Sequence, residues 1–543
     1  MSRVLEIVLC LSLEGWRPSA TGRSRTVQRD FGAELGRAWR ICPQVKMRRG
    51  HERVTIEPCQ VVEAEPSPGA NWRTWVESAE SRRVVASRTQ AFAPGVTLRE
   101  TFDTAHADVA VAGAASEPVS PTAPAGPHEQ ADGAESPSSV KSPAAAVAPG
   151  TAGVQLVCER RRGRWADDSG VSVEMTLDDM TIHDGAATRR HCELRLTAPD
   201  WGTVEARAAT LRALFAAARE LSGAWPAFAQ LASLIDRACD GALATAAPVR
   251  ARSVDLSRMT TQRDALAALA GDITIHWLGN EAGVLDHEDP EFVHQMRVAL
   301  RRLRTLMRLF PHYANGGWSE AFEADLRWLA GLLGTVRDWD VFSTESLPAL
   351  IEADGDSAAA WAGTLDTARA QCTTARADVR QALHSARYAR LTLGWLEWLS
   401  AFALPADPAA DDAPPLRQHA AKRVRRLFER LASVPPLATL DAASRHRVRI
   451  DAKRLRYALE FFASLASRHT RIDTVKTLSR VQSVLGEVND AVVALHRLEE
   501  LAAPPYQVGF VRGYAAALER HAVSVAETLL AALRPPKVGG KES

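Results

Sequence analysis

The chain has 543 residues, of which 46% are hydrophobic and 24% are charged, a composition typical of a globular protein with more than one domain. Its 66 basic and 65 acidic residues leave a net charge of +1, so net charge alone predicts no polyanionic partner. Seven scattered cysteines without a C-x-x-C pair argue against a disulfide framework and a thiolate zinc site, and they favour a cytoplasmic location. The sequence has no apolar run long enough to span a bilayer.

The first hundred residues predict a small β domain. The apolar run Val4 to Leu13 is broken by Glu6 and lacks a small-residue cleavage site, so we interpret it as a strand and not as a targeting segment. Alternating segments at 53–57 and 82–85 predict further strands. We assign residues 1–103 to the first part of this domain.

Residues 104–153 differ sharply in composition from their neighbours. They are rich in Ala, Pro, Ser and Gly, include seven prolines and have almost no large apolar side chains. Such a segment buries too little apolar surface to offset its ordering entropy, so we predict a disordered insertion. The β domain resumes at 154–241, where 171–177 and 191–196 alternate with period two and a helix follows at about 204–221.

The remainder of the chain predicts helices. After a linker at 242–258, residues 259–534 carry amphipathic Ala- and Leu-rich segments separated by prolines and glycines, and 535–543 form a tail. The spacing of these breakers predicts about eight helices, and therefore two four-helix bundles at about 259–400 and 416–534. The predicted fold class is thus a multidomain protein with an N-terminal α+β antiparallel barrel and a C-terminal all-α domain.

Two basic stripes repeat in the helical region. The residue numbers of the two copies differ by 152 throughout, and the segment 333–338 returns at the same offset as 485–490. A shared offset indicates a duplicated unit of several helices. The stripes consist of His294, Arg297, Arg301, Arg304 and the following Arg308 in the first copy, and of His446, Arg449, Lys453 and Arg456 in the second.

Each stripe lies beside a predicted core seam. In the first copy the seam residues recur at three- and four-residue steps: Val293, Met296, Leu300, Leu303, Met307 and Phe310. Like charges at these steps cost a helix about 0.2–0.5 kcal/mol per pair. Guanidinium groups donate paired hydrogen bonds to phosphate oxygens, so a chain of phosphates would offset this cost. A solvated face paired with acids on neighbouring helices is the alternative, which the duplication disfavours.

Other charged residues accompany the stripes. Asp338 and Asp490 occupy equivalent places, where they either orient the cations or form plain structural ion pairs. Arg302 and Arg454 are additional candidates for phosphate binding, although Arg302 points away from the stripe. A third basic helix, which either extends the basic surface or is a solvated face, carries His419, Lys422, Arg423, Arg425, Arg426 and Arg430, with Lys422 and Arg426 as its candidates.

The motif 294–304, together with 333–334 and 337–341, closely resembles the CHAD domain, the conserved histidine α-helical domain, and the motif 449–457 resembles it equally. The resemblance covers about residues 259–534. It implies two helical bundles related by a pseudo-twofold axis that bind inorganic polyphosphate through the basic residues of both stripes. His294 and His446 lack a second ligand at i+3 or i+4, so we expect no metal there.

The β domain resembles the CYTH domain, a triphosphate tunnel whose barrel holds acids for Mg²⁺ and basic residues for triphosphate. Strands at 171–178 and 192–196 and the basic strand at 159–162 carry this resemblance. The opening E-x-E-x-K signature reads Glu6-Ile7-Val8-Leu9-Cys10, and Arg195 stands where the family has an acid beside Glu193. The late serine-lysine motif survives only as Ser233-Leu234. We therefore predict a degenerate domain without a metal site.

These observations predict a non-catalytic polyphosphate-binding protein of the bacterial cytoplasm, associated with polyphosphate granules and without catalytic residues or cofactor. The alternative is a Mg²⁺-dependent triphosphatase in which the helical domain tethers the substrate, and Mg²⁺ is needed only in that case. Nucleic acid is a weaker alternative, because the stripes lack interleaved aromatic residues. We expect no membrane partner.

Overall fold

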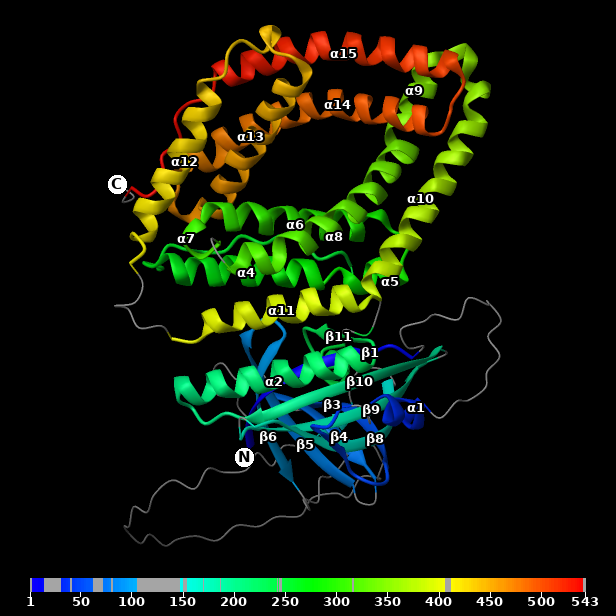
Figure 1. Cartoon of the computed structure of the whole chain (residues 1–543), viewed down its shortest axis with the longest axis vertical. Helices are drawn as coiled ribbons and strands as arrows, with labels where there is room; N and C mark the ends of the chain where they lie inside the picture. The colour runs from blue at the N-terminus through cyan, green and yellow to red at the C-terminus, as the bar shows by residue number, and fades with distance from the viewer. Residues whose placement is uncertain are drawn as a thin grey trace, which may run out of the picture.

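The structure is a computed structural model that describes residues 2–13, 31–39, 42–61, 72–79, 82–104, 147–149, 154–168, 170–185, 187–241, 243, 247–314, 317–405 and 412–540. A β-barrel occupies one end of the molecule and a larger helical domain the other (Figure 1). Apart from residues 104 and 147–149, the predicted disordered insertion lies outside the described residues.

Eight antiparallel strands close the barrel in the order β3-β8-β9-β10-β1-β6-β5-β4, with β3 and β4 again paired. Their bounds are β1 Ser2–Leu11, β3 Glu52–Val61, β4 Trp72–Ser78, β5 Arg82–Ala93, β6 Val96–Thr104, β8 Val154–Ala166, β9 Ser172–Asp184 and β10 Ala187–Pro199. Closure leaves none of these eight strands as a free sheet edge. The predicted first strand and the predicted antiparallel barrel are confirmed.

Short elements complete this domain. β2 (Val45–Met47) pairs with β8, β7 (Val147–Pro149) with β3, and β11 (Ala227–Gln230) with β1. The helices are α1 (Phe31–Ala38), α2 (Val204–Ala224) and α3 (Leu234–Cys239). The predicted helix near 204–221 corresponds to α2, whose first turn is capped by the Thr203 side chain accepting from the amide of Ala206.

The C-terminal part is helical, as predicted. Its helices are α4 Gln262–Leu278, α5 Glu281–Asp286, α6 Pro290–Leu309, α7 Pro311–Ala314, α8 Gly317–Val341, α9 Leu347–Asp354, α10 Ala362–Leu383, α11 Ala386–Ala403, α12 Leu416–Ala432, α13 Ala442–Phe461, α14 Val475–Glu500 and α15 Pro505–Ala531. The basic stripes lie on α6 and α13, which start and end at the same 152-residue offset and have 20 residues each. In the described residues, no helix is apolar over a length that would cross a membrane.

The predicted seam of α6 forms part of the core. All six seam residues, from Val293 to Phe310, are at most 3% exposed. The helix begins where the Asp289 side chain accepts from the amide of Glu291, with Pro290 in its first turn. Burial of this face fixes the rotation of α6, so the cations one position further along point to the side of the core contact.

Barrel and helical domain share one continuous apolar core. α2 and β11 of the barrel pack on α11 of the helical domain (Figure 1). Phe228 of β11 meets His384 edge to face at 5.8 Å, and an ion pair joins Arg219 of α2 to Glu397 of α11. The barrel therefore covers an apolar helix face of the other domain.

Candidate functional site

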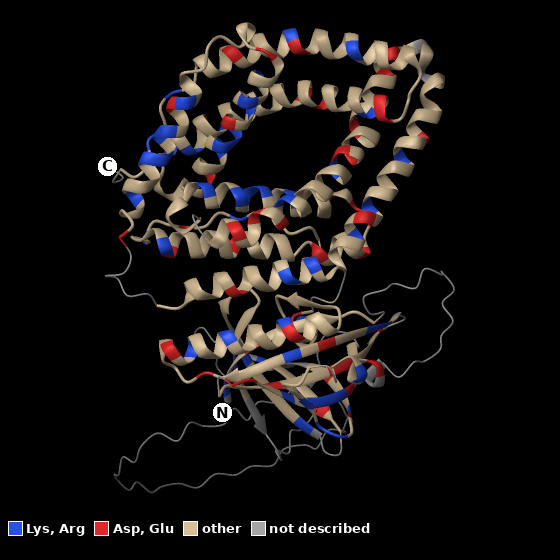
Figure 2. Ribbon diagram, in the orientation of Figure 1, with Lys and Arg blue, Asp and Glu red and all other residues tan. Residues whose placement is uncertain are grey.

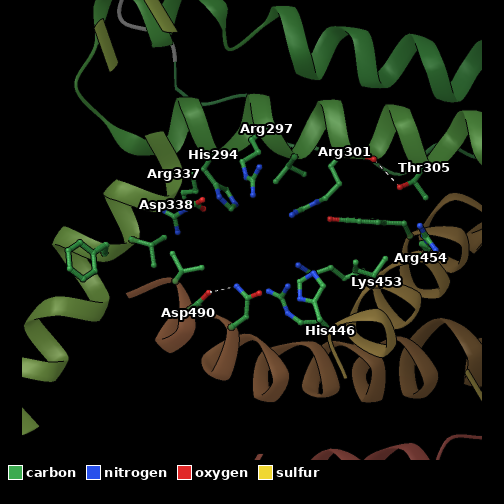
Figure 3. A pocket seen from close by; sticks show the side chains of 18 of the residues that line it. His294, Arg297, Arg301, Thr305, Arg337, Asp338, His446, Lys453, Arg454 and Asp490 are labelled. Carbon is green, nitrogen blue, oxygen red and sulfur yellow. Dashed lines mark hydrogen bonds between the residues drawn. The ribbon is translucent and has the colours of Figure 1, made fainter. Parts of the chain in front are cut away.

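A cleft of about 650 Å³ lies between the two copies of the repeat. Side chains from α6 and α8 face side chains from α13 and α14 across it (Figure 3). Its basic lining consists of His294, Arg297, Arg301, Arg308, Arg337, His446, Arg449, Lys453 and Arg454. Most residues of the two stripes, which are far apart in sequence, thus line a single cleft.

Most of these cations have no acidic partner. In the part of the chain that the structure describes, Arg297, Arg301, Arg308, Arg449 and Lys453 form no ion pair within 4 Å. The Nε atoms of Arg301 and Arg449 are buried and lack a hydrogen-bond partner. Buried donors are almost always satisfied in proteins, so these atoms indicate a site for an anionic ligand.

Burial and neighbouring like charges lower the pKa values of several cations in the cleft. Burial, together with the neighbouring Arg449 and Arg301, lowers the pKa of Lys453 to about 7. Burial also lowers the pKa of Arg297, of Arg449 and of His294, the last with help from Arg337. An anion bound among these groups would stabilise their charged forms. The cleft is thus short of negative charge.

The two repeated aspartates lie at one end of the cleft. Asp338 and Asp490 both line it, and in Figure 3 they are on the opposite side of the view from Lys453 and Arg454. Burial and the nearby Asp490 raise the pKa of Asp338, although Arg297 opposes this shift. Asp338 pairs with Arg497 at 3.6 Å, so an orienting role toward the stripes stays a prediction.

The repeated glycines lie beside stripe arginines. A Cβ atom at Gly334 would lie 3.0 Å from Nη1 of Arg297, and one at Gly486 would lie 3.9 Å from Nη2 of Arg449. Both glycines are buried inside long helices, where glycine is unfavourable by about 1 kcal/mol relative to alanine. The space at Gly334 therefore accommodates the guanidinium group of Arg297, whereas a Cβ at Gly486 would make an ordinary van der Waals contact with Arg449.

Several predicted residues lie outside the cleft lining. Arg302 is 5% exposed, lies 3.5 Å from Asp272 and stacks on the ring of Phe461, and its role in phosphate binding stays a prediction. Arg456 donates to Gln482 at 3.0 Å and pairs with Glu460. These two arginines have structural partners instead.

Arg304 and the third basic helix also lie apart from the cleft lining. Arg304 lines a neighbouring pocket of about 280 Å³ that it shares with Arg308. On α12, His419 is buried and bonds the carbonyl of Leu309 at 2.8 Å, which ties α12 to α6. Lys422 and Arg426 are exposed on α12.

Other lining residues were not among the predicted ones. Arg337 precedes Asp338 in the repeated segment and pairs with Glu345 at 3.1 Å. Thr305 and Tyr457 occupy equivalent positions in the repeat and also line the cleft. They follow Arg301 and Lys453 by four residues, so continuing the helical periodicity by one turn would have found them.

The interior of the barrel contains paired charges. Arg99 donates to Glu6 at 2.8 Å and to Asp236 at 2.6 Å, and all three side chains are at most 7% exposed. Ser233 donates to Asp236 at 2.7 Å and caps α3. Glu6 and Asp236 together hold the pKa of Arg99 above its usual value despite burial. The surviving acid of the opening signature is therefore neutralised by an arginine.

A second buried cluster in the barrel also consists of arginines paired with carboxylates. Arg160 pairs with Asp178 at 2.7 Å and with Glu77 at 3.2 Å, and Arg195 donates to Asp178 at 2.8 Å. Arg160 and Arg195 hold the pKa of Asp178 far below its usual value although the side chain is fully buried. Glu193 accepts from the amide of Leu234 at 2.7 Å.

These carboxylates do not fit a divalent metal ion. Glu6 and Asp178 are each bonded to arginines, and Glu174 on β9 has a side chain that is 53% exposed. In the described residues no three His, Cys, Asp or Glu side chains form a group able to hold a metal. Mg²⁺ requires several oxygen ligands with near-octahedral geometry.

Comparisons with known proteins concern the helical part of the chain. The model of the CHAD domain matches residues 267–499. A crystal structure of the CHAD domain from the plant Ricinus communis is 33% identical, with 54% of this chain and all of that one covered, at a TM-score of 0.47. The structure of PptA from Streptomyces chartreusis is 23% identical, with 50% of this chain and 97% of that one covered, at a TM-score of 0.38. A search of the curated proteins gave no match.

Proposed function

Since the chain belongs to the CHAD family through its residues 267–499, we propose that it binds inorganic polyphosphate in the cleft between α6, α8, α13 and α14, without catalysing its hydrolysis. The observation that carries this proposal is that five cations from both copies of the repeat, none in an ion pair within 4 Å among the described residues, converge on one cleft. A linear chain of phosphates supplies repeated negative charge along the direction in which the two stripes run. We also propose an association with polyphosphate granules in the cytoplasm.

The cleft suits a polyphosphate better than a nucleic acid. Tyr457 lines the cleft, and its ring lies beneath Arg301 at 5.5 Å and Arg456 at 4.8 Å. It is 3% exposed, so its faces are covered and do not form a stacking platform for a base. Polyphosphate lacks bases and needs no such platform.

The ion pairs inside the barrel support a binding role rather than a catalytic one. Its buried acids are held by Arg99, Arg160 and Arg195, so the residues that would bind Mg²⁺ in a triphosphatase are engaged in ion pairs. If the barrel were to hydrolyse triphosphate, these pairs would have to break in a buried environment, which is costly. We propose that the barrel serves as a folded support on which α11 packs.

Binding is tested by titrating the full chain with long-chain polyphosphate at several salt concentrations. Affinity should fall steeply with salt, because each neutralised phosphate releases counterions. Arg301→Ala combined with Arg449→Ala should remove most binding while the far-ultraviolet circular dichroism stays unchanged. Arg447→Ala, at an exposed residue of α13 outside the cleft lining, is the matched control and should keep wild-type affinity. Unchanged affinity of the double variant would refute the assignment of the site.

The non-catalytic role is tested with tripolyphosphate and Mg²⁺ or Mn²⁺. We expect no release of phosphate above a protein-free control. Metal-dependent turnover that disappears in Glu193→Ala or Glu174→Ala would overturn this part of the proposal and favour the triphosphatase alternative.

A further inference from the structure

A smaller pocket of about 280 Å³ adjoins the cleft among α6, α7 and α8. Arg308 lines both spaces, so the pocket and the cleft are neighbours along α6. Basic residues gather along α6 in Figure 2, and the last two turns of this helix bring Arg304 and Arg308 to the pocket. The first two turns of α8 contribute Trp318, Ser319 and Glu323.

Two hydrogen-bond donors of this pocket are buried without a partner. They are the indole N–H of Trp318, a residue that is 7% exposed, and Nε of Arg304, and neither has a hydrogen-bond partner among the described residues. Arg304 and Arg308 also form no ion pair within 4 Å with any residue that the structure describes. Because buried donors in proteins are almost always satisfied, two of them in one pocket indicate a ligand with acceptor atoms.

The charge of the pocket favours an anionic ligand. Burial and the neighbouring Arg454 and Arg304 lower the pKa of Arg308. Glu323 opposes this shift without cancelling it, and its carboxylate accepts from Ser319 at 2.9 Å. Two guanidinium groups against one carboxylate leave a net positive charge, and a bound anion would stabilise the charged form of Arg308.

The second copy of the repeat has a different charge pattern at the equivalent place. At the 152-residue offset, Arg304 corresponds to Arg456, and Arg308 corresponds to Glu460. Arg456 pairs with Glu460 and donates to Gln482 at 3.0 Å. The second copy therefore neutralises this position with a carboxylate of its own helix, whereas the first copy replaces that carboxylate by a second cation and leaves both without an ion pair among the described residues.

These observations extend the binding surface beyond the cleft on the first copy. We propose that polyphosphate continues from the cleft past Arg308 into this pocket, where Arg304 and Trp318 donate to phosphate oxygens. This inference rests on the proposed polyphosphate binding and adds to it a second compartment, which only chains longer than the cleft reach. Guanidinium and indole N–H groups are donors without acceptor atoms, so both suit phosphate oxygens.

The two compartments differ in the chain length that they require. Nine basic residues line the cleft, whereas two line the pocket, so a short polyphosphate occupies the cleft first. The pocket therefore contributes to the affinity for long chains and leaves the affinity for tripolyphosphate unchanged.

The contribution of the pocket is tested by comparing long-chain polyphosphate with tripolyphosphate. Arg304→Gln should weaken binding of the long chain about tenfold and lower its salt slope by about one, while the affinity for tripolyphosphate stays unchanged. Arg327→Gln is the matched control, because Arg327 is exposed on α8, lies outside both linings and donates to the backbone carbonyl of Glu323 at 3.3 Å. Equal losses for both ligands, or no loss for the long chain, would overturn the inference.

A direct contact is tested at Trp318. Trp318→Phe removes the indole N–H and keeps a ring beside Phe322, whose centroid lies 6.1 Å from that of Trp318. The variant should bind the long chain several-fold more weakly at unchanged thermal stability. In protein with isotope-labelled tryptophan, the indole N–H signal that is absent from Trp318→Phe should shift when the long chain is added and stay in place with one equivalent of tripolyphosphate.

Two results would contradict the second compartment. A shift of equal size with both ligands, or no shift with the long chain, would overturn the inference and leave polyphosphate binding in the cleft intact. If the wild type bound neither tripolyphosphate nor the long chain, the proposed function itself would fail.

Discussion

Polyphosphate binding should depend strongly on pH, because one stripe cation is a lysine with a displaced pKa. The pKa of Lys453 in the free protein is about 7, lowered by burial and by Arg449 and Arg301. A bound polyanion raises it again, so binding is accompanied by proton uptake above pH 7. His294 and His446 also have lowered pKa values and are already neutral above pH 7. A bound polyanion raises the pKa values of these histidines as well, so the Lys453→Arg variant isolates the contribution of Lys453 between pH 7 and 9.

The size of the effect follows from the linkage of one proton to binding. Because its pKa in the free protein is about 7, Lys453 is about 90% charged at pH 6 and about 10% charged at pH 8. The affinity for polyphosphate then falls up to about tenfold for each further pH unit, until the pH reaches the pKa of Lys453 in the bound state. The assay is calorimetric titration with long-chain polyphosphate, whose interior phosphates do not titrate in this range, in buffers of different ionisation enthalpy.

Lys453→Arg is the decisive variant for this prediction. Arginine stays charged throughout this range, so the variant should bind with little dependence on pH between 7 and 9 and without proton uptake. Lys476→Arg, outside the cleft lining, should keep the wild-type profile. The pKa of Lys453 is lower in the folded protein than in the unfolded chain, so the charged lysine destabilises the fold. This destabilisation is complete below pH 7 and vanishes as the pH rises toward 10.5. Lys453→Met should therefore be more stable than the wild type only at the lower pH. The reasoning would be refuted if Lys453→Arg kept the wild-type pH slope.

Three further predictions concern the glycines, the barrel and the domain junction. Gly334→Ala should weaken polyphosphate binding several-fold without loss of thermal stability, because its Cβ would lie 3.0 Å from Arg297, whereas Gly486→Ala, with 3.9 Å to Arg449, should bind like the wild type. Arg99→Met should lower the free energy of unfolding, measured by urea titration, by about 3–5 kcal/mol, because it leaves Glu6 and Asp236 buried without their partner. A loss below about 1 kcal/mol would contradict a buried ion-pair network. Leu396→Ala on α11 should destabilise the whole chain by about 2–5 kcal/mol, since this fully buried residue meets the barrel near Gly95, and separate unfolding transitions for barrel and helices would count against a shared core.

The repeat and its cleft could be predicted in large part from the sequence. α6 and α13 have the same boundaries at the predicted offset, because identical helix signals recur in both copies. The core seam from Val293 to Phe310 is buried because apolar periodicity fixes which face of a helix meets the core. Convergence of the stripes on one cleft did not follow from the spacing alone, since it depends on how α6 and α13 face each other.

The outer members of the stripes show the limit of spacing arguments. At 100° per residue, Arg304 and Arg456 lie about 80° from the direction of His294 and His446, whereas Thr305 and Tyr457 lie about 20° from it. Charge type alone therefore selected two residues outside the cleft lining, whose role in phosphate binding stays a prediction. Arg302 adds a second reason, because Asp272 on α4 neutralises it and no sequence signal links the two.

The barrel was predicted as a fold from alternating strands and from the CYTH resemblance, but its interior was not. Glu6 is 93 residues from Arg99, and Asp236 is 137 residues from it, so their pairing arises only when the barrel closes. The sequence indicated missing acids, and the structure adds that arginines neutralise those that remain. Glu6 and Asp236 pair with Arg99, and Asp178 pairs with Arg160.

The structure of the chain with bound polyphosphate tests the central claim most directly. Phosphate density should lie within hydrogen-bonding distance of Arg301 and Arg449 at once, in the cleft between α6 and α13. Density confined to the barrel, or to one copy of the repeat, would contradict the claim that both stripes form a single binding surface.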